Sequence, residues 1–182
     1  MLSVLSCLVA ASAALEPAFF LAPLSPRGEK KIAAGFLTGA AFAMMFAFMG
    51  RQIGALLPDP AARFAGIAAV MAGAGRIVKL LLRRVGFEPE GETDDNSLIQ
   101  LSAATTVHHC ACPLSVTIIP GAAGPVQALT FILGAAAAAL LIFVRVKTGG
   151  RARAVMYAAA AALAIAAGIV SLTGVSAGLP IL

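Results

Sequence analysis

Long uncharged blocks separated by short charged segments dominate the pattern of this chain. Residues 1–26 hold a single charge, Glu16, whereas residues 32–50 and 154–182 hold none. A helix needs about 20 apolar residues to cross the hydrocarbon core of a bilayer. Each of these three blocks is therefore long enough to form one transmembrane helix.

Two further blocks complete the pattern. Residues 60–82 carry Arg63, Arg76 and Lys79 near their ends, and such long cationic side chains can extend to the lipid headgroups. Residues 97–144 contain no Asp, Glu, Lys or Arg and are long enough for two crossings. The turn between these two crossings is expected at Pro120, Gly121, Gly124 and Pro125. The pattern thus predicts six transmembrane helices.

Helix-start residues fall at the expected boundaries. Asp59 can cap a helix whose first residue is Pro60, and Pro125 also suits a first helical turn. The sequence therefore supports the same division of the chain as the hydrophobic blocks.

Composition supports a membrane protein. Hydrophobic residues make up 60% of the chain and charged residues 12%, against about 45–50% and about 25% in soluble domains. Three cysteines without a CxxC pair exclude a disulfide scaffold and a zinc-finger array. Nucleic-acid binding is not expected, since the net charge of +5 comes from basic residues that flank the predicted helices.

Basic residues also predict the orientation, because short cytoplasmic loops are enriched in Lys and Arg. Eleven of the thirteen Lys and Arg residues flank the first, third and fifth connections, which are therefore expected on the cytoplasmic side. Both termini are then expected on the outer face of the inner (cytoplasmic) membrane. The segment 85–95 is then an acidic cytoplasmic loop within a single domain, 1–182. The eleven are Arg27, Lys30, Lys31, Arg76, Lys79, Arg83, Arg84, Arg145, Lys147, Arg151 and Arg153; the other two are Arg51 and Arg63.

Two three-helix halves, 1–84 and 96–182, predict an inverted repeat, because an odd number of helices per half reverses the second half. When the two halves are aligned with an offset of 93 residues, Glu16 is equivalent to His109. The only carboxylate within a predicted span thus lies opposite the only histidines of the chain, His108 and His109. Such placement in the first helix of each half is typical of a transporter binding site.

The segment 108–113 holds the densest group of metal-binding residue types. His108 and Cys112 are four residues apart and share one helical face, whereas Cys110 points elsewhere in a regular helix. Pro113 lacks an N–H, so it frees the carbonyl of His109 and favours a kink. Glu16 likewise precedes a proline, Pro17, and a carboxylate inside a membrane indicates a functional site.

Imidazole, thiolate and carboxylate suit transition metals better than magnesium or calcium. The candidate metal ligands are Glu16, His108, His109, Cys110 and Cys112. Packing remains an alternative for the two cysteines, and hydrogen bonding within the bundle remains one for Glu16.

Several features resemble the manganese-efflux pumps of the lysine-exporter superfamily. The residues that carry the resemblance are Glu16 in helix one, His109 in helix four, and Gly73-Ala74-Gly75-Arg76, which resembles the family's Gly-Gly-Arg. The family has Asp at the first two positions and a further acid in helix two that residues 36–49 lack. The resemblance implies six helices in two halves and metal export.

The cytochrome c biogenesis thiol transporters, in the same broad superfamily, provide the alternative. They place Pro-flanked cysteines in helices one and four, and Cys110, Cys112 and Pro113 have part of that pattern. Electron transfer needs two thiols that can meet. In helix one, however, the position opposite Cys110 is Pro17, and the only cysteine is Cys7.

The sequence therefore predicts a secondary transporter, not an enzyme, that exports a divalent transition metal. Proton exchange suits these ligands, although the sequence does not require it. The cargo is zinc, manganese, cobalt, nickel or copper, and no tightly bound cofactor is expected. Lipid and the metal are the expected partners, and a homodimer stays open.

Overall fold

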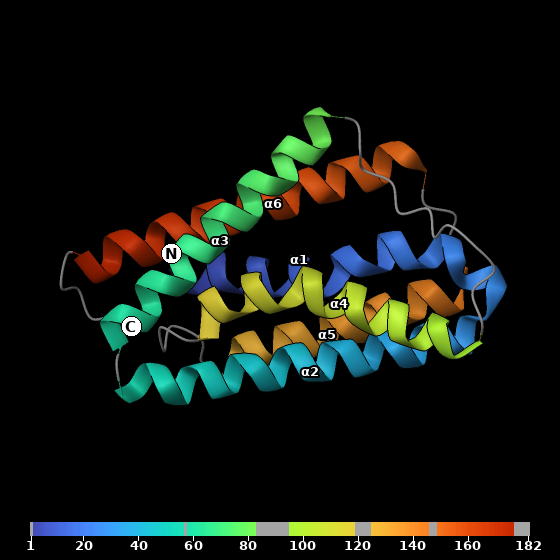
Figure 1. The fold of residues 1–182 in the computed structure, drawn as a ribbon, viewed down its shortest axis with the longest axis horizontal. Coiled ribbons are helices and arrows are strands. Elements are labelled where there is room, and N and C mark those ends of the chain that lie inside the picture. Colours follow the sequence, from blue (N-terminus) through green and yellow to red (C-terminus); the bar gives the residue numbers. More distant parts are fainter. Residues whose placement is uncertain (1, 57, 83–94, 119–124, 146–148, 177–182) are drawn as a thin grey trace.

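The computed structural model describes residues 2–56, 58–82, 95–118, 125–145 and 149–176 (Figure 1). Six α-helices fill these residues, which confirms the prediction of an all-helical chain. They are α1 (Leu2–Leu21), α2 (Glu29–Leu56), α3 (Pro58–Leu81), α4 (Asp95–Ile118), α5 (Pro125–Phe143) and α6 (Gly150–Ser176), with a 3₁₀ helix, η1 (Ala22–Arg27), after α1.

Helix boundaries agree with the sequence in part. Pro125 opens α5 as predicted, but α3 begins at Pro58 rather than at Pro60. Pro58 also has the fixed φ that suits a first turn, so the helix starts two residues earlier and Asp59 lies within that turn. The remaining residues of the predicted turn at 120–124, and nearly all of the acidic segment 85–95, lie outside the described residues.

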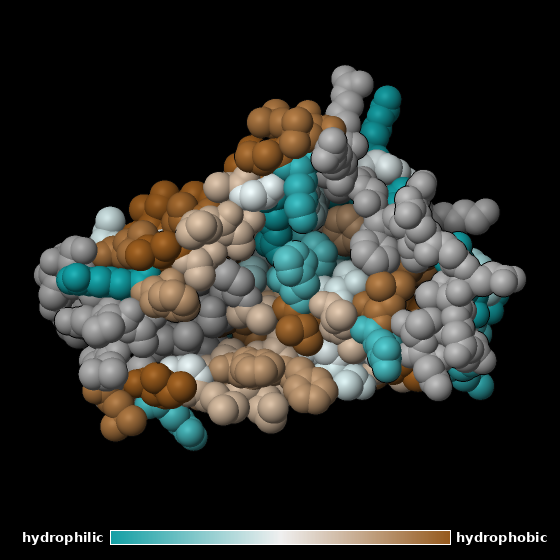
Figure 2. Space-filling model, in the orientation of Figure 1, coloured by the Kyte–Doolittle hydropathy of each residue, from teal (hydrophilic) through white to brown (hydrophobic). Residues whose placement is uncertain are grey.

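Five of the six helices are long and apolar enough to cross a membrane. The exception is α4, in which His108, His109 and several hydroxyl side chains lower the hydropathy. Many large apolar side chains point outward, among them Leu37, Phe42 and Phe46 of α2, and Figure 2 shows apolar residues spread over the face in view. This surface is consistent with a polytopic helical membrane protein.

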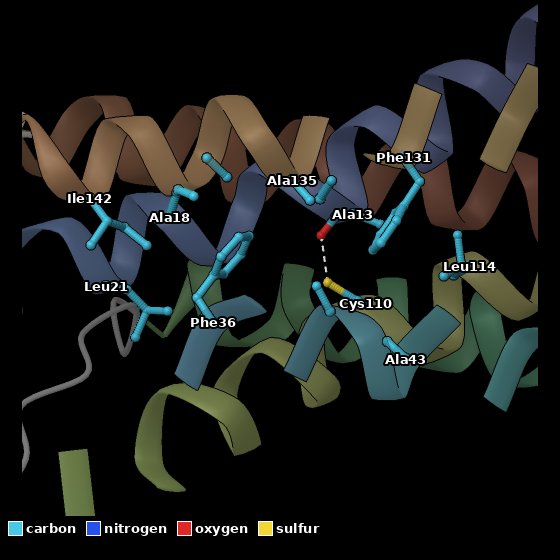
Figure 3. Close-up of a cluster of buried hydrophobic side chains, with 14 of the residues drawn as sticks. Ala13, Ala18, Leu21, Phe36, Ala43, Cys110, Leu114, Phe131, Ala135 and Ile142 are labelled. Carbon is cyan, nitrogen blue, oxygen red and sulfur yellow. Dashed lines mark hydrogen bonds between the residues drawn. The ribbon is translucent and has the colours of Figure 1, made fainter. Parts of the chain in front are cut away.

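Four helices, α1, α2, α4 and α5, form one packed unit, named here the four-helix group. In it α2 runs along α4 and α1 runs along α5. Figure 3 shows side chains from all four helices meeting in its core. The buried residues drawn there include Ala13, Ala18, Leu21, Phe36, Ala43, Cys110, Leu114, Phe131, Ala135 and Ile142.

The other two helices form the α3–α6 pair, which lies across the upper side of the molecule in Figure 1. Small residues let the two backbones approach closely. A Cβ placed on Gly168 would lie 2.7 Å from the carbonyl oxygen of Gly66. A second, smaller core joins the pair to α1 through Val9, Ala65, Ala69 and Ala167.

Gly35 and Gly39 of α2 face α4 at close approach. A Cβ on Gly39 would lie 2.5 Å from the carbonyl oxygen of Ala103 in α4. Small residues at this four-residue spacing thus set the distance between α2 and α4, and this distance fixes the position of α4 within the bundle.

Candidate functional site

Glu16 is the most deeply buried charged residue that the structure describes, and its side chain is fully enclosed. Its Oε1 lies 3.0 Å from Nδ1 of His109. Its Oε2 lies 3.1 Å from Nη2 of Arg76. Glu16 and His109, which are equivalent when the halves are aligned with an offset of 93 residues, are therefore in direct contact. Arg76 contacts both of them.

Arg76 overturns one expectation from the sequence. It does not extend to a headgroup region, since its side chain is only 8% exposed and is turned into the bundle. A buried carboxylate favours a nearby positive charge, and Arg76 provides it. Lys79, one turn further along α3, is exposed and behaves as expected.

This burial changes the orientation argument little. Without Arg76, the basic residues that flank the odd connections fall from eleven to ten, still against two for the second. The signal that could have identified Arg76 is the motif 73–76, in which Gly73, one turn before Arg76, packs closely against Ala161 and Ile165 of α6.

Two prolines leave helix carbonyls without an intrahelical partner, and both carbonyls receive one from another helix. Pro113 leaves the carbonyl of His109 free, as the sequence predicts, and Nη2 of Arg76 donates to it at 3.1 Å. Pro17 similarly leaves the carbonyl of Ala13 free, and Sγ of Cys110 donates to it at 2.8 Å. Each proline thus exposes an oxygen in the interior of the bundle.

Aromatic side chains enclose the imidazole of His109. Phe20 stacks on it with ring centroids 5.2 Å apart. Tyr157 of α6 meets both rings edge-on, with its centroid 6.2 Å from that of His109. The guanidinium carbon of Arg76 lies 5.9 Å from the centroid of the Tyr157 ring. Sequence analysis does not identify Phe20 or Tyr157, because their contacts with His109 join three different helices.

The proton positions follow from the partners. A carboxylate only accepts hydrogen bonds, so Nδ1 of His109 carries a proton and donates it to Glu16. Nη2 of Arg76 lies 3.5 Å from the same Nδ1, and two donors at that distance pack together without a bond. Nη1 of Arg76 is buried and has no hydrogen-bond partner among the described residues. Glu16 thus accepts a hydrogen bond from His109 through Oε1 and forms an ion pair with Arg76 through Oε2, which has no hydrogen-bond partner among the described residues.

The remaining predicted ligands lie apart from this cluster or outside the description. His108 is exposed, and its ring meets that of His109 edge-on at 5.4 Å. Cys110 is fully buried and its thiol faces Ala13 on α1. Cys112 belongs to α4, but its side chain lies outside the described part. Within the described residues no three His, Cys, Asp or Glu side chains form a group that could hold a metal ion. Among the described side chains of the predicted set, Glu16 and His109 are the two in direct contact.

No protein-family model, curated protein or solved structure matches the chain. The resemblance to manganese-efflux pumps therefore stays a prediction that depends on Glu16, His109 and residues 73–76.

Proposed function

We propose that this chain is a secondary transporter that exports a divalent transition metal from the cytoplasm and exchanges it for protons at Glu16 and His109. The observation that supports this most strongly is the 3.0 Å contact between Oε1 of Glu16 and Nδ1 of His109, enclosed within a bundle of apolar helices. An ionisable pair costs free energy in such a place and is typical of ion pathways.

The pair has the chemistry for exchange. Carboxylate oxygen and imidazole nitrogen both bind transition metals, at about 2.0–2.2 Å. When two such atoms bind one ion, the distance between them is within a few tenths of an ångström of the 3.0 Å that separates Oε1 and Nδ1 here. The same two atoms share a proton when no metal is bound. Because a metal ligand must be free of its proton, the cation and the proton compete for one place. That competition is the physical basis of coupled exchange.

We further propose that the two halves of the chain are inverted repeats. The site formed by Glu16 and His109 then lies where the two halves meet. Exchanging the halves turns the α2–α4 contact into the α5–α1 contact and leaves the α3–α6 contact unchanged, and all three contacts are extensive. Glu16 and His109 also come from the first helix of each half. Transporters with this symmetry alternate access by moving one bundle against another around a fixed site.

The proposed orientation has both termini outside the cytoplasmic membrane, as the basic residues predict. Reporter fusions at each terminus test it. A reporter active only on the cytoplasmic side would contradict the orientation and the direction of export.

The geometry favours metal transport over thiol electron transfer. A thiol carrier needs two cysteines that can meet each other and a partner protein. Cys110 is buried and donates to Ala13, which leaves its thiol turned away from any surface. Cys7 and Cys110 are both free thiols.

A metal-accumulation assay in cells tests the proposal. Expression of the chain is expected to lower the cellular content of at least one of zinc, manganese, cobalt, nickel and copper. Glu16→Gln and His109→Ala are expected to abolish the effect. The matched control is Glu29→Gln, because Glu29 also forms an ion pair, with Arg145, but at a partly exposed position. Unchanged content of all five metals would contradict the proposal.

Proton coupling has its own test in liposomes that enclose a pH-sensitive dye. Addition of the exported metal is expected to change the internal pH with the wild-type chain and not with Glu16→Gln. Metal movement without any pH change would contradict proton exchange while leaving metal export intact.

A further inference from the structure

We infer that Arg76 is a tethered cation that occupies the metal site when the site is empty, so that cargo must displace it to bind. This inference rests on the proposed function and adds the residue that sets the affinity of the site. It concerns a residue that the sequence places at a helix end but the structure places inside the bundle.

One nitrogen atom of Arg76 lies close to both residues of the proposed exchange site, Glu16 and His109. Nη2 lies 3.1 Å from Oε2 of Glu16, 3.1 Å from the carbonyl oxygen of His109 and 3.5 Å from Nδ1 of the same histidine. An oxygen-and-nitrogen set of this kind is what a borderline divalent cation selects. The guanidinium therefore stands where the cargo would stand.

Charge prevents the two cations from sharing the site. Among the described residues, Glu16 is the only carboxylate in contact with Arg76, and one negative charge cannot neutralise both a guanidinium and a divalent ion. In a buried site of low polarity, repulsion between like charges is strong. Binding of the metal therefore requires Arg76 to leave.

Arg76 already has a second partner besides Glu16. Its guanidinium carbon lies 5.9 Å from the centroid of the Tyr157 ring, and aromatic faces attract cations, so this ring remains as a partner when Arg76 leaves Glu16. Nη1 of Arg76 is buried without a partner, so the hydrogen bonding of this residue is incomplete in the occupied position. Both Arg76 and Tyr157 belong to the α3–α6 pair, whereas Glu16 and His109 belong to the four-helix group. Withdrawal thus separates residues that already lie on different units.

Titration of the purified full-length chain with Co²⁺ tests the inference, because the visible absorption of Co²⁺ reports its nitrogen and oxygen ligands. Arg76→Gln removes the competing charge and is expected to lower the Kd for Co²⁺ at least tenfold relative to the wild type. Arg76→Lys keeps a cation and is expected to bind within about threefold of the wild type. Glu16→Gln is expected to bind weakly whether or not Arg76 is also replaced.

Tyr157→Leu gives an independent measurement with the opposite sign. It removes the ring that remains as a partner of Arg76 but keeps Glu16 and His109, so it is expected to raise the Kd several-fold. If the elution and melting of Arg76→Gln in detergent show that it does not fold, the Kd of Tyr157→Leu tests the inference instead.

The outcomes separate the inference from the proposed function. Equal or weaker Co²⁺ binding by folded Arg76→Gln overturns the inference, as does unchanged or tighter binding by Tyr157→Leu when Arg76→Gln does not fold. Absence of Co²⁺ and Zn²⁺ binding from both the wild type and Arg76→Gln overturns the metal site itself. Tighter binding by Arg76→Gln together with weaker binding by Tyr157→Leu supports both.

Discussion

The four-helix group and the α3–α6 pair are packed in different ways. Both units use glycines where two backbones approach closely, at Gly39 against α4 and at Gly66 and Gly168 between α3 and α6. The four-helix group also encloses an extensive apolar core with large side chains such as Phe36, Leu114 and Phe131. Interdigitated side chains resist relative movement, and a core that is closely filled transmits strain. The α3–α6 pair packs against the rest of the bundle through a smaller apolar core.

This difference bears on the site because the site is divided between the two units. Glu16 and His109 come from the four-helix group, and Arg76 and Tyr157 come from the α3–α6 pair. The ion pair between Glu16 and Arg76 is a strong polar contact between the units. The proposed site therefore depends on how the two units are held together.

Removal of Glu16 is expected to have the largest effect on stability. Glu16→Ala leaves Arg76 as an uncompensated buried charge, which costs about 3–5 kcal/mol of unfolding free energy. Denaturant unfolding in micelles measures it. Glu29→Ala, which breaks the ion pair with the half-exposed Arg145, serves as the control and is expected to leave the midpoint nearly unchanged. Equal midpoints for the two variants would contradict the burial of the Glu16–Arg76 pair.

The close packing of the α3–α6 pair gives the next largest effect. Gly168→Ala adds a Cβ that meets the Gly66 carbonyl, and overpacking of this kind costs about 1–3 kcal/mol. Gly75→Ala in α3 is the matched control, because a Cβ there meets nothing within 4 Å. Thermal melting should separate the two variants. A lower melting temperature for Gly75→Ala than for Gly168→Ala would contradict the described interface.

The thiol of Cys110 gives the smallest effect. Cys110→Ser keeps a donor to the Ala13 carbonyl, whereas Cys110→Ala leaves that buried oxygen without a partner, at a cost of about 1 kcal/mol. Melting temperature measures the difference, and metal export is expected to persist in Cys110→Ser. Complete loss of function in Cys110→Ser, with normal folding, would favour the thiol carrier.

The sequence predicts much of the fold and part of the site. Block length is sufficient for the helices, because the cost of placing charge in lipid confines charged residues to connections. The equivalent positions of Glu16 and His109 follow from the offset of 93 residues between the two halves. The free carbonyl of His109 follows from Pro113. These features depend on local chemistry, which a sequence displays directly.

The missed residues depend on packing between distant helices. An arginine near a helix end can reach the headgroups or turn into the bundle, and only the position of α3 relative to Glu16 decides which. Phe20, Arg76 and Tyr157 meet His109 from three different helices. No periodicity within one helix specifies such a contact.

The most direct test of the account is a double-mutant cycle between Glu16 and Arg76, with unfolding free energies measured in the absence of metal. Glu16→Gln and Arg76→Gln are each expected to destabilise the chain. The double variant is expected to be more stable than the sum of the single effects predicts, by about 2 kcal/mol, because the two residues interact directly across the units. Additive effects, within about 0.5 kcal/mol, would show that no ion pair joins the four-helix group to the α3–α6 pair and would contradict the account.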